Sequence, residues 1–499
     1  MALRDRLLPK TLISSQEVRV PEMALGYLVA PFCAMVANAV FGSYLNRYYV
    51  DVLGWTRFGA FATLLPIVSS ILVIAGNLYV GSLIDRTRTS AGKARPYLIA
   101  AAPLAVVAIV LLLMTPREGS AGIQMLWIAL TYNLYYAVAY PCYFTAHSSL
   151  VALSTRDQDK RGILATLSNA SSVAAAGIGA SVLAPILLQP FMFVAGDSGS
   201  IDVAASYANW RILSIAFALI TAAGIMLEYL FTRERVTEEG LDDDAPASTE
   251  NRSVREHIAA CTGDRTWRLV MLFVLVFQFG QLCKNASMSF YCRWMFDAAT
   301  GSATPEAASA ALMSAMGMIG GIPAGPGMLI AWPLAKRIGK RHAIMYGLIF
   351  ALAGGLVAFL NVNSFPVVAA SVVLKAIGII PAQFVLLALI SDVLDRLEEK
   401  NGFRSDGFTM SLYSSVMVGL GGLGTGLING MLTFSGYSNV GYAVDPATNT
   451  LIADLATWAG PVVYQQLGGT GAVLALAYLG IDVISFALSI LLLRRIDLD

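Results

Sequence analysis

Two lysines lie within long apolar segments of the chain, where a positive charge is costly. Lys284 falls near the middle of residues 269–296, and Lys375 falls in the first half of residues 367–390. A charged side chain at bilayer depth costs a few kcal/mol at least, so such residues usually serve a function. An ammonium group pairs well with a carboxylate, which predicts an anionic ligand. The alternatives are that each lysine extends to the interface, pairs with a backbone carbonyl or is held neutral by burial.

Polar side chains accompany Lys284 at helical spacing. Gln278, Gln281 and Asn285 recur at three- and four-residue intervals, so a helix would carry them on the same face as Lys284. A polar stripe on a membrane helix faces water, a bound solute or another helix. We therefore expect these residues to contact a solute.

A second stripe is aromatic. Residues 123–150 carry Tyr136, Tyr140 and Tyr143, again at helical spacing, and His147 follows one turn later. Tyrosine offers a flat face for a sugar ring and a hydroxyl for hydrogen bonds, which suits a ligand site. Core packing or an interfacial aromatic belt remains an alternative. His147 could relay protons, although a structural histidine is the other possibility.

The remaining polar side chains of the apolar segments complete the predicted solute-binding set. They are Asn38, Asn77, Asn169, Gln383 and Tyr413. Nothing in the sequence predicts an enzyme, a cofactor or a metal site: the five cysteines show no CxxC spacing, and no nucleophile accompanies a base. Residues 419–424 fit GxGxxG, but they lie inside an apolar segment with no preceding strand, so they do not predict a nucleotide site.

The composition is that of a membrane protein. Hydrophobic residues make up 57% of the chain and charged residues 13%, and the formal net charge of +1 gives no sign of nucleic-acid binding. Segments long enough to cross a bilayer recur six times on each side of a polar break. These segments are residues 23–50, 58–84, 97–114, 123–150, 163–194, 212–231, 269–296, 307–334, 344–360, 367–390, 408–434 and 472–493.

The loops between these segments predict orientation and domains. Basic residues gather in alternate loops and near both termini, which predicts that both termini lie in the cytoplasm. We expect the protein in the inner membrane. Residues 232–266 contain an acidic run and predict a solvated linker between residues 1–231 and residues 267–499. Matching loops in the two halves are typical of a transporter that works by alternating access.

One long motif carries a family resemblance. The stretch from Gly81-Ser-Leu-Ile-Asp85 to Gly92-Lys93-Ala-Arg95-Pro96-Tyr97 resembles a loop of the glycoside-pentoside-hexuronide symporters, the melibiose permease family of the major facilitator superfamily. Further stretches at residues 44–54, 157–161 and 391–407 agree in the same order. The resemblance implies an all-α membrane protein whose twelve transmembrane helices form two pseudo-symmetric six-helix bundles, and a sugar symporter or uniporter.

Charges within these matching loops predict gates. Ion pairs among them would form when one side closes and break when it opens, although single charges could merely set topology. The predicted gating residues are Asp85, Arg86, Arg88, Lys93, Arg95, Asp157, Arg161, Asp392 and Arg404. Arg47 precedes Asp51 by four residues, which predicts a local ion pair instead.

The family's cation site is altered in this sequence. Val73, Asn77, Met35 and Val418 stand where the resemblance implies charged residues, and Tyr143 or Phe144 stands at the matching place in the fourth segment. Hard cations require oxygen ligands that carry charge. We therefore expect no sodium site, and either facilitated diffusion or coupling to a proton.

The major facilitator fold would place both lysines beside its central cavity. We find no acidic residue inside the cavity-lining segments, and Asp482 belongs to a segment that this fold places outside, so we do not expect it to pair with either lysine. The unpaired lysines therefore predict a small anionic solute, and the resemblance implies that it is a glycoside or uronide. We also expect a monomer in the lipid bilayer. The alternatives are a lipid or lysolipid transporter, a proton-coupled sugar symporter, and a sensor without transport.

Overall fold

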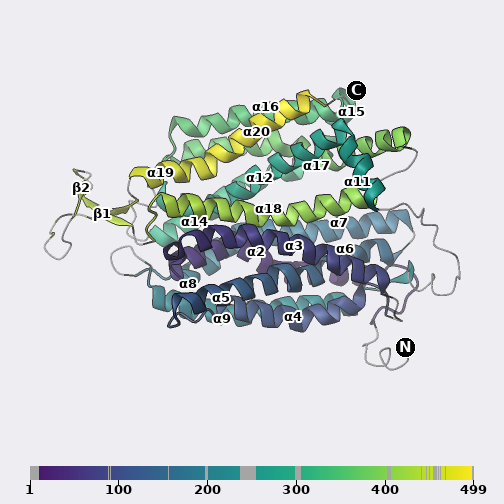
Figure 1. The fold of residues 1–499 in the computed structure, drawn as a ribbon, viewed down its shortest axis with the longest axis horizontal. Helices are drawn as coiled ribbons and strands as arrows, with labels where there is room; N and C mark the ends of the chain where they lie inside the picture. Colours follow the sequence, from purple (N-terminus) through teal and green to yellow (C-terminus); the bar gives the residue numbers. More distant parts are fainter. Residues whose placement is uncertain are drawn as a thin grey trace. The chain divides into compact units, whose positions relative to one another are not determined.

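The computed structural model contains two compact units, each with its own hydrophobic core (Figure 1). It describes residues 11–496 except 88, 90, 156, 197–200, 237–253, 298–304, 402–405, 440, 446, 449, 453–457, 459, 461 and 467. Unit 1 comprises Met1–Gly42, Val68–Ala180 and Tyr207–Glu250. Unit 2 comprises Ser43–Ile67, Ser181–Ser206 and Asn251–Asp499.

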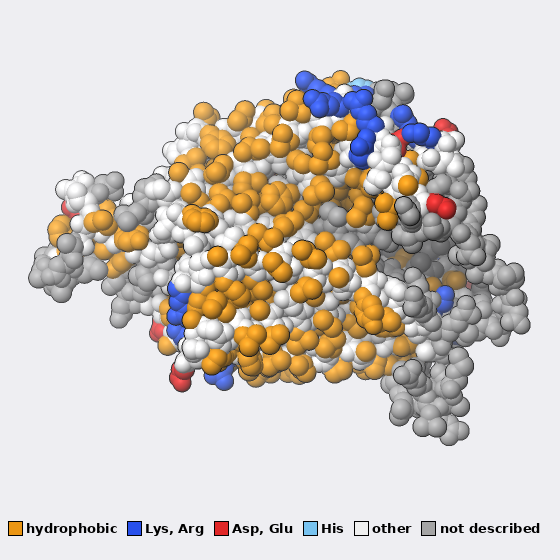
Figure 2. Space-filling model, viewed as in Figure 1, with side chains coloured by type: hydrophobic (Ala, Val, Ile, Leu, Met, Phe, Trp, Pro, Cys, Tyr) orange, Lys and Arg blue, Asp and Glu red, His pale blue; other side chains and the backbone are white. Residues whose placement is uncertain are grey.

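The apolar segments form helices, as expected. In lipid every backbone N–H and C=O group must find a partner within the chain, and a helix provides one. Among the described residues, eight helices are long and apolar enough to cross a membrane. Hydrophobic side chains cover the middle of the helices in Figure 2, and charged side chains gather near the helix ends. The prediction of an all-α membrane protein is confirmed.

Helices of the first half of the sequence contain several π-helical turns, at which one extra residue enters the helix. The elements up to residue 230 are η1 (Glu22–Val29), α2 (Ala30–Arg47), η2 (Tyr48–Val52), η3 (Trp55–Phe58), α3 (Ala60–Arg86), α4 (Arg95–Leu113), α5 (Ala121–Asn133), η4 (Leu134–Ala139), α6 (Tyr140–Ser154), α7 (Gln158–Ala174), η5 (Ala175–Leu188), α8 (Gln189–Met192) and α9 (Val203–Leu230). The 3-10 turn η3 joins the first two predicted spans.

The second half is also helical. Its elements are α11 (Val254–Gly263), α12 (Arg265–Trp294), α14 (Pro305–Gly321), α15 (Ala324–Ile338), α16 (Lys340–Val357), η7 (Ala358–Leu360), α17 (Phe365–Asn401), α18 (Asp406–Phe434), α19 (Gly468–Ala475), η8 (Leu476–Gly480) and α20 (Ile481–Arg494). The eighth predicted span is broken between α14 and α15, where Pro323 precedes the first residue of α15. Proline lacks the N–H that a continuous helix requires.

A small sheet separates α18 from α19, and the sequence analysis did not predict it. Strands β1 (Tyr442–Asp445), β2 (Thr450–Leu451) and β3 (Val463–Gln465) are antiparallel in the order β2-β1-β3. Val444 pairs with Leu451 on one side and with Val463 on the other. A second difference concerns α17, which continues through Asp392 to Asn401, where a loop was predicted.

The two units do not coincide with the two halves of the sequence. Ser43–Ile67 and Ser181–Ser206 come from the first half, yet they pack with the second half in unit 2. Close contacts explain this grouping: the Asn429 side chain donates to the Ala62 carbonyl oxygen at 3.1 Å, and Gly426 lies against Ile67. The division at residues 1–231 and 267–499 therefore remains a prediction.

The predicted solvated linker is structured at both ends. Glu234 and Arg235 are buried, and Arg235 forms an ion pair of 2.7 Å with the buried Glu22. Residues 254–263 form α11. The acidic run at residues 238–244 lies outside the described residues.

Candidate functional site

Lys284 lies on α12 within the polar face that its sequence predicts. Its Nζ donates to Gln281 Oε1 at 3.3 Å, and Asn285 is exposed. Gln278, two turns earlier, hydrogen-bonds the Tyr413 hydroxyl of α18. Within the part of the chain that the structure describes, no carboxylate forms an ion pair with Lys284. Lys284 therefore remains a candidate for binding an anionic ligand.

Lys375 is different, and the expectation that it lacks a carboxylate partner is wrong. Its Nζ lies 2.8 Å from Asp482 Oδ2, and the side chains are 5% and 1% exposed. Asp482 lies close to α17 because two glycines nearby have no side chain to keep the helices apart. Gly280 of α12 faces Asp482 and Ser485, and Gly355 of α16 faces the Lys375 methylenes. The pair leaves Lys375 no charge to offer an anionic solute.

The two lysines and the aspartate still form one electrostatic group. Lys284 interacts at a distance with both Lys375 and Asp482. Two positive charges and one negative charge leave a net charge of one positive unit, carried by Lys284. Gln383, also predicted to contact the solute, is exposed on α17.

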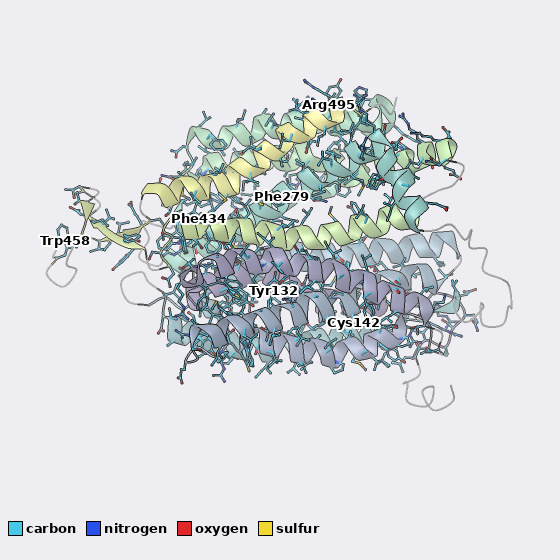
Figure 3. The ribbon with its side chains drawn as sticks, in the orientation of Figure 1. Tyr132, Cys142, Phe279, Phe434, Trp458 and Arg495 are labelled. Atoms are coloured by element: carbon cyan, nitrogen blue, oxygen red, sulfur yellow. The ribbon has the colours of Figure 1, made fainter. Side chains whose placement is uncertain are left out.

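The tyrosine stripe of unit 1 contains a π-helical turn. η4 separates α5, where Tyr132 lies, from α6, where Cys142 lies (Figure 3). The rings of Tyr132 and Tyr136 lie 4.6 Å apart between centroids, and Tyr135, which was not predicted, donates to Asn38 Oδ1 at 3.4 Å. π-Helical turns often occur at functional sites because they shift which side chains face a site. The extra residue of η4 explains why Tyr135 faces Asn38 together with the predicted tyrosines.

Other predicted solute contacts of unit 1 have mixed outcomes. Asn169 is exposed on α7. Tyr140 is partly exposed and stacks on Phe144 with ring centroids 5.5 Å apart. The Asn77 amide donates to the Val73 carbonyl oxygen of its own helix at 2.9 Å. Tyr143 is buried, and its hydroxyl donates to Glu228 Oε2 at 2.9 Å, so this hydroxyl is not available to a solute.

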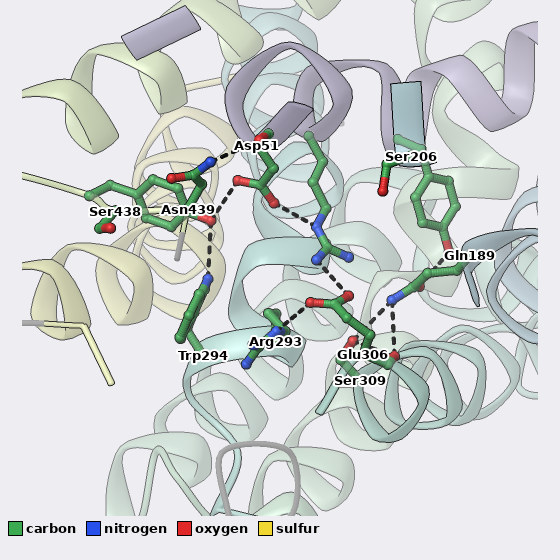
Figure 4. A network of polar contacts seen from close by, with 12 residues as sticks. Asp51, Gln189, Ser206, Arg293, Trp294, Glu306, Ser309, Ser438 and Asn439 are labelled. Atoms are coloured by element: carbon green, nitrogen blue, oxygen red, sulfur yellow. Dashed lines mark hydrogen bonds and ion pairs between the residues drawn. The ribbon is translucent and has the colours of Figure 1, made fainter. Parts of the chain in front are cut away.

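A network of charged side chains joins helix ends of unit 2 (Figure 4). In each unit we call the end that carries basic loops the basic-loop end: residues 86–96 and 155–161 mark it in unit 1, and residues 336–341 mark it in unit 2. The network lies at the other end of unit 2, because Glu306 lies in the first turn of α14 and Lys336 in the last turn of α15. The predicted Arg47–Asp51 ion pair is confirmed at 2.9 Å. Arg47 also pairs with Glu306 at 2.7 Å, and Arg293 pairs with the other oxygen of Glu306 at 2.6 Å. All four are buried, and their charges sum to zero.

Neutral groups extend this network. The Tyr437 hydroxyl donates to Asp51 Oδ1 at 2.9 Å and accepts from Trp294 Nε1 at 3.0 Å. Asn439 donates to the Asp51 carbonyl oxygen, and Gln189 donates to Ser309 Oγ at 2.9 Å. Segments from both halves of the sequence are therefore tied together at this end of unit 2 (Figure 4).

At the basic-loop end of unit 1, the predicted gating residues Lys93 and Arg95 lie beside Glu234, which the sequence did not single out. The Glu234 carboxylate accepts the backbone N–H groups of Lys93, Ala94 and Arg95 at 2.7–2.8 Å, which neutralises the first turn of α4. Gly92 makes this possible because its φ is 111° and a Cβ there would collide with the Glu234 carboxylate. The Arg95 guanidinium bonds the Tyr229 carbonyl oxygen at 3.0 Å.

The other predicted gating residues are described only in part. Asp392 forms an ion pair of 2.6 Å with Lys340, and both side chains are partly exposed. Asp157 accepts the backbone N–H of Lys160 at the start of α7. Arg88 and Arg404, and the side chains of Asp85, Arg86 and Arg161, lie outside the described part of the chain.

Comparison with known proteins gives a consistent family. The model of the family described as MFS/sugar transport protein matches residues 26–499. The isoprimeverose transporter of Lactiplantibacillus pentosus is 25% identical over 425 residues, which cover 82% of this chain and 80% of the relative. The glucuronide carrier protein homolog of Escherichia coli K12 is 27% identical over 402 residues, which cover 78% of each chain.

Solved structures resemble the fold. The nucleoside transporter NupG matches 95% of this chain and 98% of its own with a TM-score of 0.57 at 12% identity. A bacterial homolog of the human lysosomal transporter Spinster, in an inward-facing and unoccupied conformation, matches 96% of both chains with a TM-score of 0.56 at 13% identity. Together with the family match, these likenesses confirm the predicted transporter fold.

Proposed function

Because the chain belongs to the MFS/sugar transport protein family, we propose that it moves a polar, anionic glycoside or uronide across the membrane by alternating access. The family establishes a multi-pass membrane transporter and not an enzyme. One relative is named for isoprimeverose and another for a glucuronide, which supports the solute class. The excess of basic residues in alternate loops supports placing both termini in the cytoplasm.

The observation that carries the anionic solute is Lys284. Lys284 is partly buried within a membrane span, where an ammonium group without a carboxylate partner is unfavourable, whereas a solute carboxylate beside it would offset its desolvation. Gln281 lies within hydrogen-bond distance and Asn285 is exposed one residue away, so neutral groups can bind solute hydroxyls at the same place. Lys375 contributes nothing to this argument because Asp482 already compensates its charge.

We further propose that sodium is not the coupling ion. Val73 and Met35 are buried apolar residues, and the Asn77 amide donates to its own helix. A sodium ion requires several oxygen ligands with negative charge among them. These side chains supply no such charge.

Counterflow in proteoliposomes tests the solute class. Purified protein is reconstituted, and exchange of methyl β-D-glucuronide is compared with exchange of the uncharged methyl β-D-glucoside, with and without sodium. We expect Lys284→Gln to slow glucuronide exchange by roughly tenfold or more, since a buried charge pair contributes a few kcal/mol. Glucoside exchange should change little.

The matched control is the double variant Lys375→Gln with Asp482→Asn, which removes the compensated pair without changing the net charge. We expect it to retain the preference for glucuronide. Unchanged glucuronide exchange in Lys284→Gln would remove Lys284 from solute binding, and a sodium requirement in the wild type would show that the cation site lies elsewhere.

One observation favours the lipid or lysolipid alternative. A cavity of about 270 Å³ between α12 and α18 is lined almost entirely by apolar atoms, from residues that include Met271, Leu272, Leu275 and Leu412. Pockets for polar ligands usually measure about 300–1,000 Å³ and combine apolar walls with several polar groups. This cavity exposes almost no polar surface. Transfer of a fluorescent lysolipid between proteoliposome leaflets, blocked by Leu275→Trp, would support the alternative.

A further inference from the structure

Three helices of unit 1 bring a glutamate and a histidine together out of contact with solvent. Glu228 of α9 is 0% exposed and His147 of α6 is 2% exposed. Their Oε1 and Nδ1 atoms lie 2.6 Å apart. Tyr143 donates to the second Glu228 oxygen at 2.9 Å, and Ser168 Oγ of α7 lies 2.9 Å from His147 Nε2. Every polar atom of the two side chains therefore has a partner.

We propose that the Glu228–His147 pair is the site at which this transporter binds a coupling proton. The inference rests on the proposed function, since a coupling proton has meaning only in a transporter. Among the described residues, no lysine or arginine forms an ion pair with Glu228. Its ion-pair partner in this part of the chain is the imidazole of His147, a group that can be either neutral or charged.

Charge balance explains why one proton matters. With one proton on the pair, either as carboxylate and imidazolium or as carboxylic acid and imidazole, the net charge is zero. Loss of that proton leaves one buried negative charge, which is costly in a low dielectric. The buried conformation therefore favours the pair that holds its proton, and release requires a conformation in which water reaches the pair. This is the behaviour that a coupled carrier needs.

Within the described ranges, no permanently charged side chain forms an ion pair with Glu228 or His147. Two tyrosines interact with Glu228, Tyr143 of α6 and Tyr27 of η1, and Tyr140 and Cys33 lie close to Tyr143. Arg235 and Glu22 act on Tyr27 from farther away, but they form an ion pair of their own. The Thr232 hydroxyl bonds the Glu228 backbone and not its carboxylate. The balance between the two protonation states is therefore set inside the pair.

α7 links the pair to a predicted solute contact. It carries Ser168, which bonds the imidazole, and the adjacent Asn169, which is exposed. Tyr140 and Phe144 form the other connection: their rings are stacked, and the Phe144 ring lies 6.3 Å from His147. A solute that shifts α7 at Asn169 also shifts the hydroxyl at His147 Nε2. Solute binding and proton binding are thereby coupled.

The first test needs no solute. The chain contains three histidines, so the variant His257→Gln with His342→Gln leaves His147 as the only imidazole. In liposomes, ¹⁵N-histidine NMR should then report the protonation of His147 alone, and Glu228→Gln should change how that signal depends on pH, because the carboxylate that shares the proton is gone. Tyr143→Phe keeps both titrating groups and should change it less. The same pH dependence of the His147 signal in the wild type and in Glu228→Gln would overturn the proposal.

The second test measures coupling. An inward pH gradient is imposed on sodium-free proteoliposomes, and accumulation of methyl β-D-glucuronide is followed. The wild type should accumulate solute above equilibrium, whereas Glu228→Gln should reach equilibrium only and still catalyse counterflow. Accumulation by Glu228→Gln would disprove the coupling site. Absence of any sugar counterflow in the wild type would instead contradict the proposed solute, and the NMR titration would still decide whether the pair binds a proton.

Discussion

Two buried charge clusters in this protein are built on different principles. In unit 2, Arg47 and Arg293 are paired with Asp51 and Glu306 at 2.6–2.9 Å. Arginine stays protonated at every accessible pH, so these pairs respond to structure and not to proton concentration. In unit 1, Glu228 has an imidazole as its partner, and an imidazole, unlike a guanidinium, exists in both a charged and a neutral form. The first cluster is suited to holding helix ends together, and the second to sensing protons.

The largest expected effect comes from removing the shared carboxylate of the unit 2 cluster. Glu306→Gln removes the anion that lies 2.6 Å from the buried Arg293 and 2.7 Å from the buried Arg47. We expect the unfolding free energy to fall by about 3 kcal/mol or more, as is usual when one partner of a buried pair is removed. Thermal unfolding in detergent measures the loss. Glu118→Gln, at an exposed site, is the matched control and should change it by about 0.5 kcal/mol or less.

The same variant can show whether the cluster holds the helices closed. Cys292 is fully buried beside Arg293, so in a chain without the other four cysteines it reports opening of this end of unit 2. Maleimide labelling of Cys292 should accelerate in Glu306→Gln. If stability falls while labelling stays slow, the cluster contributes to folding but does not gate.

The next effect separates a compensated charge from an uncompensated one. Asp482→Asn leaves the Lys375 ammonium group buried without an anion, and we expect a loss of about 3 kcal/mol. Combining it with Lys375→Gln removes both charges and should recover most of the loss in the same unfolding measurement. A double variant as unstable as Asp482→Asn would mean that packing beside Gly280 and Gly355, and not charge, dominates this site.

The smallest effect concerns a carboxylate at a helix end. Asp264 caps α12 by accepting the Trp267 N–H at 2.9 Å and lies 3.2 Å from Lys400. Burial opposes its ionisation, but the Trp267 N–H and Lys400 together hold the pKa of Asp264 below its usual value. Its contribution to stability is therefore present above the unfolded pKa of about 3.9 and is lost as the pH falls through the lower folded pKa.

Asp264→Ala should cost about 1 kcal/mol near neutral pH, and Asp264→Asn less, because asparagine also caps helices. Chemical unfolding at neutral and at acidic pH measures both variants. Equal stability of the wild type and the alanine variant at neutral pH would show that the cap contributes nothing.

Local patterns were predictable from the sequence. Apolar segments gave the helices, and the four-residue spacing of Arg47 and Asp51 gave their ion pair. The break in the eighth span was not predictable from proline alone, because Pro323 lies at the break whereas Pro381 lies inside the continuous helix α17. The polar face around Lys284 followed from helical periodicity alone.

Partners distant in sequence were not predictable. Arg47 and Glu306 are 259 positions apart, and no local spacing relates them. Asp482 was assigned to an outside helix, although Gly280 and Gly355 could have indicated a helix close enough to reach Lys375. Glu228 stands near the end of its predicted span, where a charge usually reaches water, so its burial was not evident from the sequence. Its burial depends on packing against α6, which periodicity does not reveal.

The break between α14 and α15 has a mechanical consequence. α14 begins with the turn that holds Glu306, whereas α15 ends with Lys336 and Arg337 at the basic-loop end. Because the backbone ladder is interrupted between them, the two pieces of this span can tilt by different amounts. If the ion pairs of Glu306 break, α14 can then change its tilt while α15 keeps its own packing. The two ends of this span can therefore rearrange at different times.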